Sequence, residues 1–286
     1  MEPVNHQYIR CFDLGGSGLK TALVIYDPTK KSMRIEGSVQ QLGKCPDDQK
    51  VSDWARKKIQ EIAKTDLDQE AKKGYLFGFS LAGLDKLRKK SVSTDDMAQL
   101  FDLPKERVAY TGDGNAHLIA SLKSVKNLPE GRIWNIALGT GVGFGITNSK
   151  KEVKPSGDLK KFFGCEAWEA KELTTNKGIW EAGSGPAFDK IVHNNGNNTS
   201  KAIEEFAGRW KLFIEKQIIE RSKNEGKEWA APNAVVFTGG HIEWNDDRLT
   251  NALNKAGLKV PAFTGPKQAG VLGAAWLAVE NSRKKY

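Results

Sequence analysis

Two glycine-rich turns, each flanked by apolar segments, constrain the fold of this 286-residue chain more than any other feature. The first turn, Gly15 to Gly18, follows Phe12-Asp13-Leu14 and precedes Thr21 to Tyr26, a segment rich in strand-forming residues. The second turn, Gly139 to Gly141, interrupts the apolar stretch Ile133 to Thr147. Each segment therefore predicts a strand, a tight turn and a second strand. Because the backbone N–H groups of such turns can bind phosphate oxygens, the pair indicates nucleotide-dependent chemistry.

The common phosphate-binding and catalytic motifs do not explain these turns. A P-loop ends in Gly-Lys followed by Ser or Thr, whereas Leu19 here separates Gly18 from Lys20. The dinucleotide pattern G-x-G-x-x-G fails at both turns, and the chain has no H-E-x-x-H, G-x-S-x-G or EF-hand motif. The turns therefore belong to another kind of phosphate site.

The composition is that of a globular protein, with 39% hydrophobic and 28% charged residues. The length allows two domains of ordinary size. No apolar run approaches the roughly 18 residues that a membrane span needs. The first residues have neither a basic start nor an apolar core, so we expect no secretory signal. Cys11, Cys45 and Cys165 are widely spaced and form no C-x-x-C pair, which favours reduced thiols in the cytoplasm.

The formal net charge of +9 is compatible with nucleic acid, an anionic membrane or an anionic small ligand. The densest basic run, Asp85 to Lys90, contains no aromatic residue of the kind that stacks on bases. We interpret this run as a solvated face, and we expect neither a nucleic acid nor a membrane partner.

Strand-like and helix-like segments alternate in both halves of the chain. In the first half, strand patterns at Tyr75 to Ala82 and Arg107 to Thr111 precede a helix pattern at Ala116 to Lys123. In the second half, a long amphipathic helix pattern at Lys201 to Lys223 precedes a buried strand pattern at Ala234 to Thr238. No linker rich in Gly, Ser or Pro is visible. We therefore predict two related α/β domains packed together with a cleft between them.

Asp13 stands directly before the first turn. A carboxylate at the end of a strand can hold a hydrated Mg²⁺ ion beside phosphate oxygens. Ser17 can donate a hydrogen bond, and Lys20 adds positive charge. The alternative interpretation is a simple hairpin in which Asp13 caps its own turn, but the second glycine turn makes that alternative less favourable.

Five motifs then occur in one order along nearly the whole chain. They are Asp13 to Lys20, Asp113-Gly114-Asn115-Ala116, Leu138 to Gly145, Phe237-Thr238-Gly239-Gly240, and Gly270-Val271-Leu272-Gly273-Ala274-Ala275. Each motif is weak alone, but their order and spacing together resemble those of the ROK sugar kinases, which include glucokinase-like enzymes. These kinases belong to the larger hexokinase, actin and Hsp70 superfamily.

The resemblance implies a role for each matched residue. It implies Mg²⁺ near Asp13, held through water, and a general base at Asp113 that takes a proton from a sugar hydroxyl. It also implies ATP as the nucleotide. The matched ATP contacts are Gly15, Gly16, Ser17, Lys20, Gly139, Thr140 and Gly141 for the phosphates, and Gly239 and Gly240 on the adenosine side.

A separate physical argument supports Asp113. This residue follows a strand pattern and precedes a helix pattern, so it is expected at the carboxyl edge of a sheet, where ligands bind. A carboxylate there can orient an acceptor hydroxyl and accept its proton. The alternative is a structural N-cap of the helix that runs through His117.

The acceptor side of the predicted site departs from the family pattern. Gly112 replaces the Asn that usually precedes the catalytic aspartate. The nearest stretch to the family's Gly-Glu-x-Gly-His element, Gly157 to Lys161, lacks both the Glu and the His, and the cysteine cluster that binds zinc is absent. We therefore expect no zinc. Glu181 and Asn115 are candidate sugar contacts, although Glu181 is equally compatible with a surface position at a helix start.

The predicted fold is a two-domain, actin-like (ribonuclease H-like) ATPase fold with a nucleotide cleft between the domains. We predict an N-terminal domain over 1–112, a C-terminal domain over 113–264, and a closing helix within 265–286 that packs back near the first domain. The predicted function is ATP- and Mg²⁺-dependent phosphorylation of a sugar hydroxyl. A catalytically weak nucleotide-binding regulator or scaffold is the alternative. The sugar, the choice between ATP and polyphosphate as donor, and a homodimer stay open.

Overall fold

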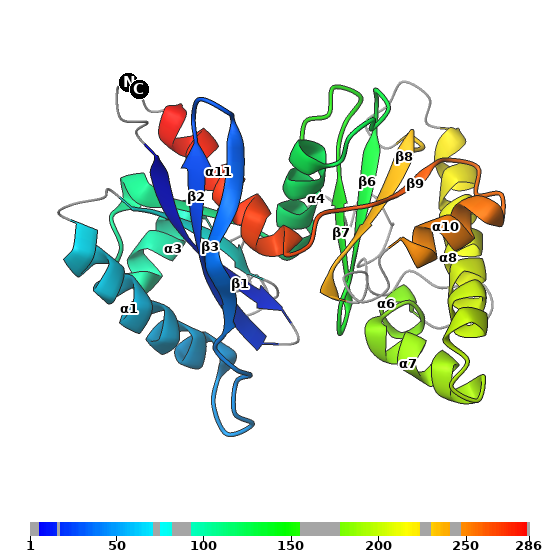
Figure 1. Ribbon diagram of the computed structural model, residues 1–286, viewed down its shortest axis with the longest axis horizontal. Helices are drawn as coiled ribbons and strands as arrows, with labels where there is room; N and C mark the ends of the chain where they lie inside the picture. Colours follow the sequence, from blue (N-terminus) through cyan, green and yellow to red (C-terminus); the bar gives the residue numbers. More distant parts are fainter. Residues whose placement is uncertain are drawn as a thin grey trace. The chain divides into compact units, whose positions relative to one another are not determined.

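The chain divides into two compact units, which are described separately. One unit comprises Met1–Ala116 with Gly270–Tyr286, and the other comprises His117–Ala269. The computed structural model, drawn in Figure 1, describes residues 6–15, 18–70, 75–81, 93–154, 178–223, 230–240 and 247–284.

The first unit is built on a sheet whose described strands follow the order β3-β2-β1-β4-β5. The strands are β1 (Gln7–Gly15), β2 (Gly18–Asp27), β3 (Ser32–Gln41), β4 (Leu76–Leu81) and β5 (Val108–Thr111). The pairs β1–β2 and β2–β3 are antiparallel, while β4 is parallel to both β1 and β5. The carboxyl ends of β1, β4 and β5 therefore meet at one edge of this sheet.

Successive side chains of β1 and β4 point to opposite faces of the sheet, and both faces carry apolar side chains. One face packs against α1 (Val51–Glu70) and α3 (Thr94–Phe101), and its core contains the stacked rings of Phe12 and Phe79. The other face packs against α11 (Ala269–Arg283), which returns from the end of the chain. A short 3-10 turn, η1 (Lys105–Arg107), leads into β5.

Two polar contacts fasten these helices to the strands. On the α1 side, Arg10 of β1 forms a two-point ion pair with Asp66, with nitrogen–oxygen distances of 2.6 and 2.9 Å. On the α11 side, Arg283 donates a hydrogen bond to the Tyr26 hydroxyl at 2.6 Å and covers the Tyr26 ring. The side chain of Asp66 is almost fully buried, so its pairing with Arg10 satisfies a charge that would otherwise be costly.

The second unit repeats this design on a smaller sheet with the described order β7-β6-β8-β9. Its strands are β6 (Ile133–Leu138), β7 (Val142–Ile146), β8 (Ala234–Thr238) and β9 (Ala262–Thr264). The β6–β7 hairpin is antiparallel, and β8 is parallel to both β6 and β9. Both sheets thus contain a hairpin with a glycine turn followed by two parallel strands, and the first sheet has β3 as an additional antiparallel strand beside β2. This repeat confirms the predicted two-domain α/β fold class.

Helices cover both faces of the second sheet. Leu118 of α4 (Asp113–Ser124) packs on the face formed by Ile133, Ala234 and Val236. The helices over the opposite face are α6 (Ile179–Ala182), α7 (Gly185–Asn194), α8 (Thr199–Ser222) and α10 (Arg248–Lys255).

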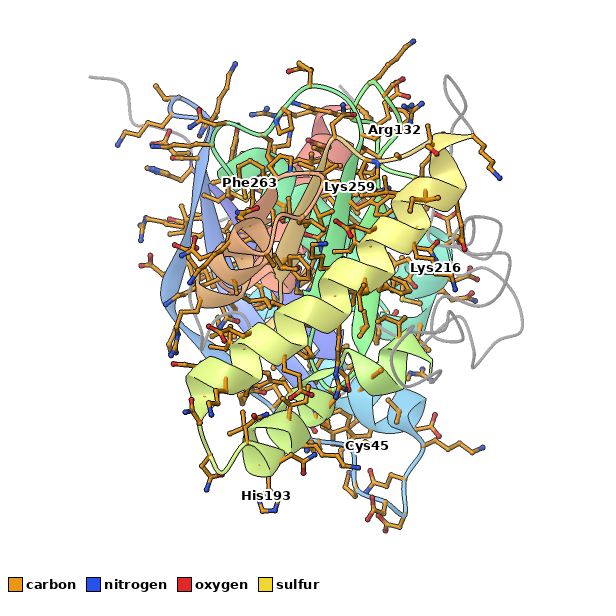
Figure 2. The ribbon with its side chains drawn as sticks, turned by 90° about the vertical axis from the view of Figure 1, so that its right-hand side faces the viewer. Cys45, Arg132, His193, Lys216, Lys259 and Phe263 are labelled. Atoms are coloured by element: carbon orange, nitrogen blue, oxygen red, sulfur yellow. The ribbon has the colours of Figure 1, made fainter. Side chains whose placement is uncertain are left out.

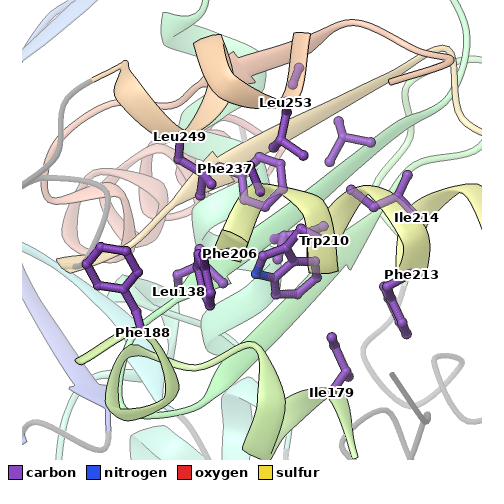
Figure 3. Close-up of a cluster of buried hydrophobic side chains, with 14 of the residues drawn as sticks. Leu138, Ile179, Phe188, Phe206, Trp210, Phe213, Ile214, Phe237, Leu249 and Leu253 are labelled. Atoms are coloured by element: carbon purple, nitrogen blue, oxygen red, sulfur yellow. The ribbon is translucent and has the colours of Figure 1, made fainter. Parts of the chain in front are cut away.

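Trp210 of α8 lies at the centre of the larger core of this unit (Figure 3). Its ring makes edge-on contacts with Phe213 and Phe237, each at a centroid distance of 5.7 Å. A Cβ on Gly183 would lie 2.6 Å from the Trp210 ring, so only glycine fits against this face. Aromatic packing of this density fixes α8 on the sheet.

No helix among the described residues is long and apolar enough to cross a membrane.

Candidate active site

One row of residues crosses the carboxyl edge of the first sheet. Asp13 of β1 pairs with Lys20 of β2 on one side and with Ser80 of β4 on the other, and Ser80 pairs in turn with Thr111 of β5. Adjacent strands lie about 4.8 Å apart, so the Cα atoms of Asp13 and Thr111 are roughly 10 Å apart. Asp113 follows Thr111 by two residues, and the carboxylates of Asp13 and Asp113 therefore belong to the same edge.

The Asp13 carboxylate is held by Ser80, whose hydroxyl donates to Oδ1 at 2.8 Å. Packing of protein atoms around the carboxylate raises the pKa of Asp13 above its ordinary value, while the Ser80 hydrogen bond and the Lys20 charge act in the opposite direction. Ser80 itself is fully buried. The protein thus keeps a poorly solvated acid at this edge, and a bound cation would stabilise its ionised form.

The first turn of α11 lies directly against this acid. A Cβ on Gly270 would come within 2.6 Å of the Asp13 carboxylate. Glycine is therefore required here, and the amino end of a 15-residue helix stands beside a negative group. Ser80 and Gly270 were not identified as site residues from the sequence. A lone serine in the apolar run Leu76–Leu81 was the available signal for Ser80.

Asp113 is the first residue of α4, which begins three residues before the predicted helix start at Ala116. The Gly112 carbonyl accepts the first helical hydrogen bond from the Ala116 N–H at 3.0 Å, so Gly112 occupies the cap position. Asp113 is therefore the first helical residue and follows the cap position. Asn115 is 5% exposed and lies within the first turn of the helix.

The start of α4 is also fixed by α11. A Cβ on Gly273 would lie 1.8 Å from the Ala116 carbonyl oxygen, and a Cβ on Gly78 would lie 2.5 Å from the Ala274 carbonyl oxygen. The two glycines allow α11 to contact the backbone of both α4 and β4. The Gly270 to Ala275 motif thus has a packing role beside both candidate carboxylates.

The second glycine turn closes the β6–β7 hairpin with three residues. The Gly139 N–H donates to the Gly141 carbonyl at 3.0 Å, and the Gly139 carbonyl accepts from the Gly185 N–H at 2.7 Å. Within the described part of the chain, no backbone hydrogen bond uses the N–H of Thr140 or Gly141. These two N–H groups are the donors that this turn can offer to a ligand.

The Gly239–Gly240 turn lies beside the end of β6. Gly239 has a φ of +101°, and a Cβ there would lie 2.3 Å from the Leu138 carbonyl oxygen. The Gly239 backbone therefore approaches the residue that precedes Gly139. The structure brings the predicted adenosine-side turn and the second phosphate turn together within one unit.

Three of the predicted ligand-contacting glycines face open space. A Cβ built on Gly15, Gly139 or Gly240 meets nothing within 4 Å, in contrast to Gly239, Gly270 and Gly273. Turn backbone without side chains leaves room for the close approach of phosphate groups. Each of these three glycines therefore leaves space for a ligand at its own turn. Gly16 and Ser17 lie outside the described residues.

The described residues contain no group of three or more His, Cys, Asp or Glu side chains that could hold a metal ion by themselves. His193, for example, projects outward from α7 (Figure 2). Asp13 alone still fits Mg²⁺, which usually keeps several waters and binds one or two carboxylates together with substrate phosphates. Glu181 belongs to α6, but its side chain is outside the described residues.

Comparisons with solved structures identify proteins of the same architecture. The inorganic polyphosphate/ATP-glucomannokinase from Arthrobacter sp. strain KM superimposes with a TM-score of 0.65 at 16% identity, covering 97% of this chain and 99% of that chain. The chain has the ROK sugar kinase fold. A ROK-family glucokinase from Streptomyces griseus, solved with glucose and AMPPNP, gives a TM-score of 0.59 at 16% identity, and the match covers 96% of this chain and 99% of that chain.

The same fold also occurs in a regulator. A ROK-family transcriptional regulator, a homologue of the E. coli MLC protein, gives a TM-score of 0.60 at 14% identity, covering 96% of this chain and 78% of that chain. The sequence matches no protein-family model and no curated protein. At these identities the likeness establishes the fold, and the activity must be argued from the residues.

Proposed function

We propose that this protein is a sugar kinase that transfers a phosphoryl group from ATP, with Mg²⁺, to a hydroxyl of a sugar or sugar-like substrate. The row Lys20–Asp13–Ser80–Thr111, with Asp113 two residues beyond it, is the observation that carries the proposal. This row has one carboxylate that can act beside the metal ion, Asp13, and Asp113 follows it as a carboxylate that can act as the base. Sugar kinases that share this fold also support the proposal, through the likeness of their overall structure.

Asp13 serves as the metal-side acid in this proposal. Its carboxylate is poorly solvated and oriented by Ser80, so it favours a nearby hydrated cation. ATP with Mg²⁺ supplies a phosphoryl group that is activated for transfer. The N–H groups of Thr140 and Gly141 stabilise negative charge on phosphate oxygens, and Lys20 contributes positive charge beside Asp13.

Asp113 serves as the general base. Its position at the first residue of α4 leaves its carboxylate at the sheet edge, where it can accept a hydrogen bond from the attacking hydroxyl. The carboxylate orients this hydroxyl and takes its proton as the new phosphate ester forms, a contribution of roughly 10²- to 10⁴-fold. Because phosphoryl transfer depends mainly on position and charge, a small displacement of α4 would slow it.

A nucleotide-binding regulator is the second candidate, because a transcriptional regulator has the same fold. The absence of the family's Gly-Glu-x-Gly-His element from the sequence favours this alternative, and the retained Asp113 favours the kinase. The two candidates differ in turnover but not in nucleotide binding.

A coupled assay of ADP formation over a panel of hexoses and amino sugars tests the proposal. We expect at least one sugar to give Mg²⁺-dependent ADP formation together with a sugar phosphate detected by mass spectrometry. The same sugars are also assayed with inorganic polyphosphate in place of ATP, which shows which of the two is the phosphoryl donor. Binding of ATP with Mg²⁺ but no phosphorylation of any sugar in the panel would favour the regulator.

A further inference from the structure

A chain of four polar side chains lies inside the second unit, between α4 and the sheet. His117 and Ser121 come from α4, Asn135 from β6 and Thr238 from the last position of β8. Ser121, Asn135 and Thr238 are at most 1% exposed, while His117 is partly buried. Their neighbours on this face, Leu118, Ile133, Ala234 and Val236, are all apolar.

The four side chains are joined by short hydrogen bonds. The Asn135 amide donates to the Thr238 hydroxyl at 3.0 Å, and the Thr238 hydroxyl lies 2.9 Å from His117 Nδ1. The Ser121 hydroxyl lies 2.9 Å from both Asn135 Oδ1 and the His117 carbonyl oxygen. A threonine hydroxyl can accept one hydrogen bond and donate another, so Thr238 is held from two sides.

Such a chain fixes geometry more strictly than apolar packing does. An amide or hydroxyl group in an apolar environment is costly unless it is hydrogen-bonded. A rotation of Thr238 would therefore take away the hydroxyl that accepts from Nδ2 of buried Asn135. The surroundings are also close-packed, because a Cβ on Gly265 would lie 2.2 Å from Thr238 Cγ2 and 2.9 Å from Ser121 Oγ. Thr238 is therefore confined to one rotamer and one position.

The position of Thr238 determines where the next turn begins. Gly239 follows directly, with its left-handed backbone against Leu138, and Gly240 comes next with open space in front of it. A change in the backbone direction at Thr238, where β8 ends, would displace both glycines. The hydrogen bonds of Thr238 thus act on the backbone that is expected to face the nucleoside.

We propose that His117 is a positioning residue for nucleotide binding, which acts with Asn135 through Thr238 to orient the Gly239–Gly240 turn. This inference rests on the proposed function only insofar as that turn binds a nucleotide. It does not require that a sugar be phosphorylated.

The experiment measures the affinity for AMPPNP with Mg²⁺ by isothermal titration calorimetry, with the melting temperature recorded for every variant. Thr238→Val keeps the side-chain shape and removes the hydroxyl, and we expect it to weaken AMPPNP binding about fivefold, the effect of one lost hydrogen bond. His117→Leu should weaken binding to a similar extent. His117→Asn, whose amide can replace Nδ1, should restore the affinity to within about twofold of wild type.

Thr147→Val is the matched control. Thr147 is equally buried in the same unit, and its hydroxyl accepts from the Ile133 N–H at 2.9 Å, at the end of β6 remote from Gly139. This variant should lower the melting temperature as Thr238→Val does, while AMPPNP affinity stays within about twofold of wild type. In a double-mutant cycle, His117→Leu combined with Thr238→Val should bind no more weakly than the weaker single variant.

The proposal is overturned if Thr238→Val and Thr147→Val bind AMPPNP equally well, or if His117→Leu lowers the melting temperature without changing the affinity. It is also overturned, together with the proposed function, if the wild-type protein binds no AMPPNP. A wild-type protein that binds AMPPNP and phosphorylates no sugar contradicts the proposed function alone, and the variants then still decide the role of His117.

Discussion

Asp13 and Ser80 occupy the same register position of two neighbouring parallel strands, and the Ser80 hydroxyl donates a hydrogen bond to the Asp13 carboxylate at 2.8 Å. Parallel strands present their carboxyl ends at one edge, so this pairing holds the acid where a ligand can reach it. The first turn of α11 also packs against the carboxylate, at Gly270. Asp13 is thus oriented before any ligand arrives.

Ser80→Ala should weaken the metal-dependent step while leaving the fold intact. The Asp13 carboxylate would lose its donor, and its pKa would rise further. We expect the affinity for AMPPNP with Mg²⁺ to fall about threefold to tenfold, because a hydrogen bond to a charged group is lost. Calorimetric titration with and without Mg²⁺ measures the effect. An equal loss in both titrations would contradict a role next to the metal.

Asp13→Asn should make the protein without ligands more stable at neutral pH. The folded-state pKa of Asp13 is raised, so below pH 3.8 both the folded and the unfolded wild type hold the proton and no difference arises. As the pH rises through the raised pKa, the unfolded state loses its proton more readily and the wild type loses stability. Asparagine does not titrate, so the stability advantage of the variant grows over this window.

Denaturant unfolding of both proteins from pH 3.5 to pH 8 measures this difference. Loss of the acid should also lower kcat/KM with Mg²⁺ by about 10- to 100-fold, as expected for a group that acts through metal-bound water. A variant that is less stable than wild type at pH 7 would show that the acid is well satisfied without a cation.

Substitutions at two glycines distinguish an effect on packing from an effect on ligand binding. Gly273→Ala places a methyl group 1.8 Å from the Ala116 carbonyl oxygen and should lower the free energy of unfolding by about 2 kcal/mol or more. Gly139→Ala meets open space, so its free energy of unfolding should stay within about 0.5 kcal/mol of wild type. It should nevertheless reduce AMPPNP affinity at least about tenfold, because the methyl group stands where phosphate is expected. Unchanged affinity in Gly139→Ala would argue against phosphate binding at this turn.

Asp66→Asn should destabilise the first unit without touching the site. The change leaves the largely buried Arg10 guanidinium without its ion-pair partner, and breaking such a pair costs about 3 kcal/mol. The double variant Arg10→Met with Asp66→Leu removes both charges and should recover most of that loss. Denaturant unfolding measures both effects, and unchanged AMPPNP affinity in the double variant is the control. A double variant as unstable as Asp66→Asn would contradict this explanation.

The fold was predictable because its strongest signals are local. Two hairpins with glycine turns, and apolar strands such as Ala234–Thr238, follow from the pattern of residues alone. Short elements without such patterns were missed, including β9 and α10. The predicted start of α4 was three residues too late, because Asp113, Gly114 and Asn115 have low helix propensity and are helical only in their packed context.

The candidate site was predictable only in part. Asp13 and Asp113 follow from motifs, but Ser80, Gly270 and the Thr238 hydrogen-bond chain depend on strand register and helix packing, which bring together residues far apart in sequence. A single serine or asparagine in an apolar strand is a weak signal. It becomes informative only when the strand opposite it is known.

The role of Asp113 in the reaction is tested by comparing Asp113→Asn with wild type under single-turnover conditions, using the sugar identified by the coupled assay. We predict that phosphorylation slows at least about 100-fold, while AMPPNP affinity with Mg²⁺ and the melting temperature stay close to wild type. This result would mean that Asp113 acts in the chemical step. Phosphorylation at the wild-type rate in Asp113→Asn would show that this carboxylate is not the general base.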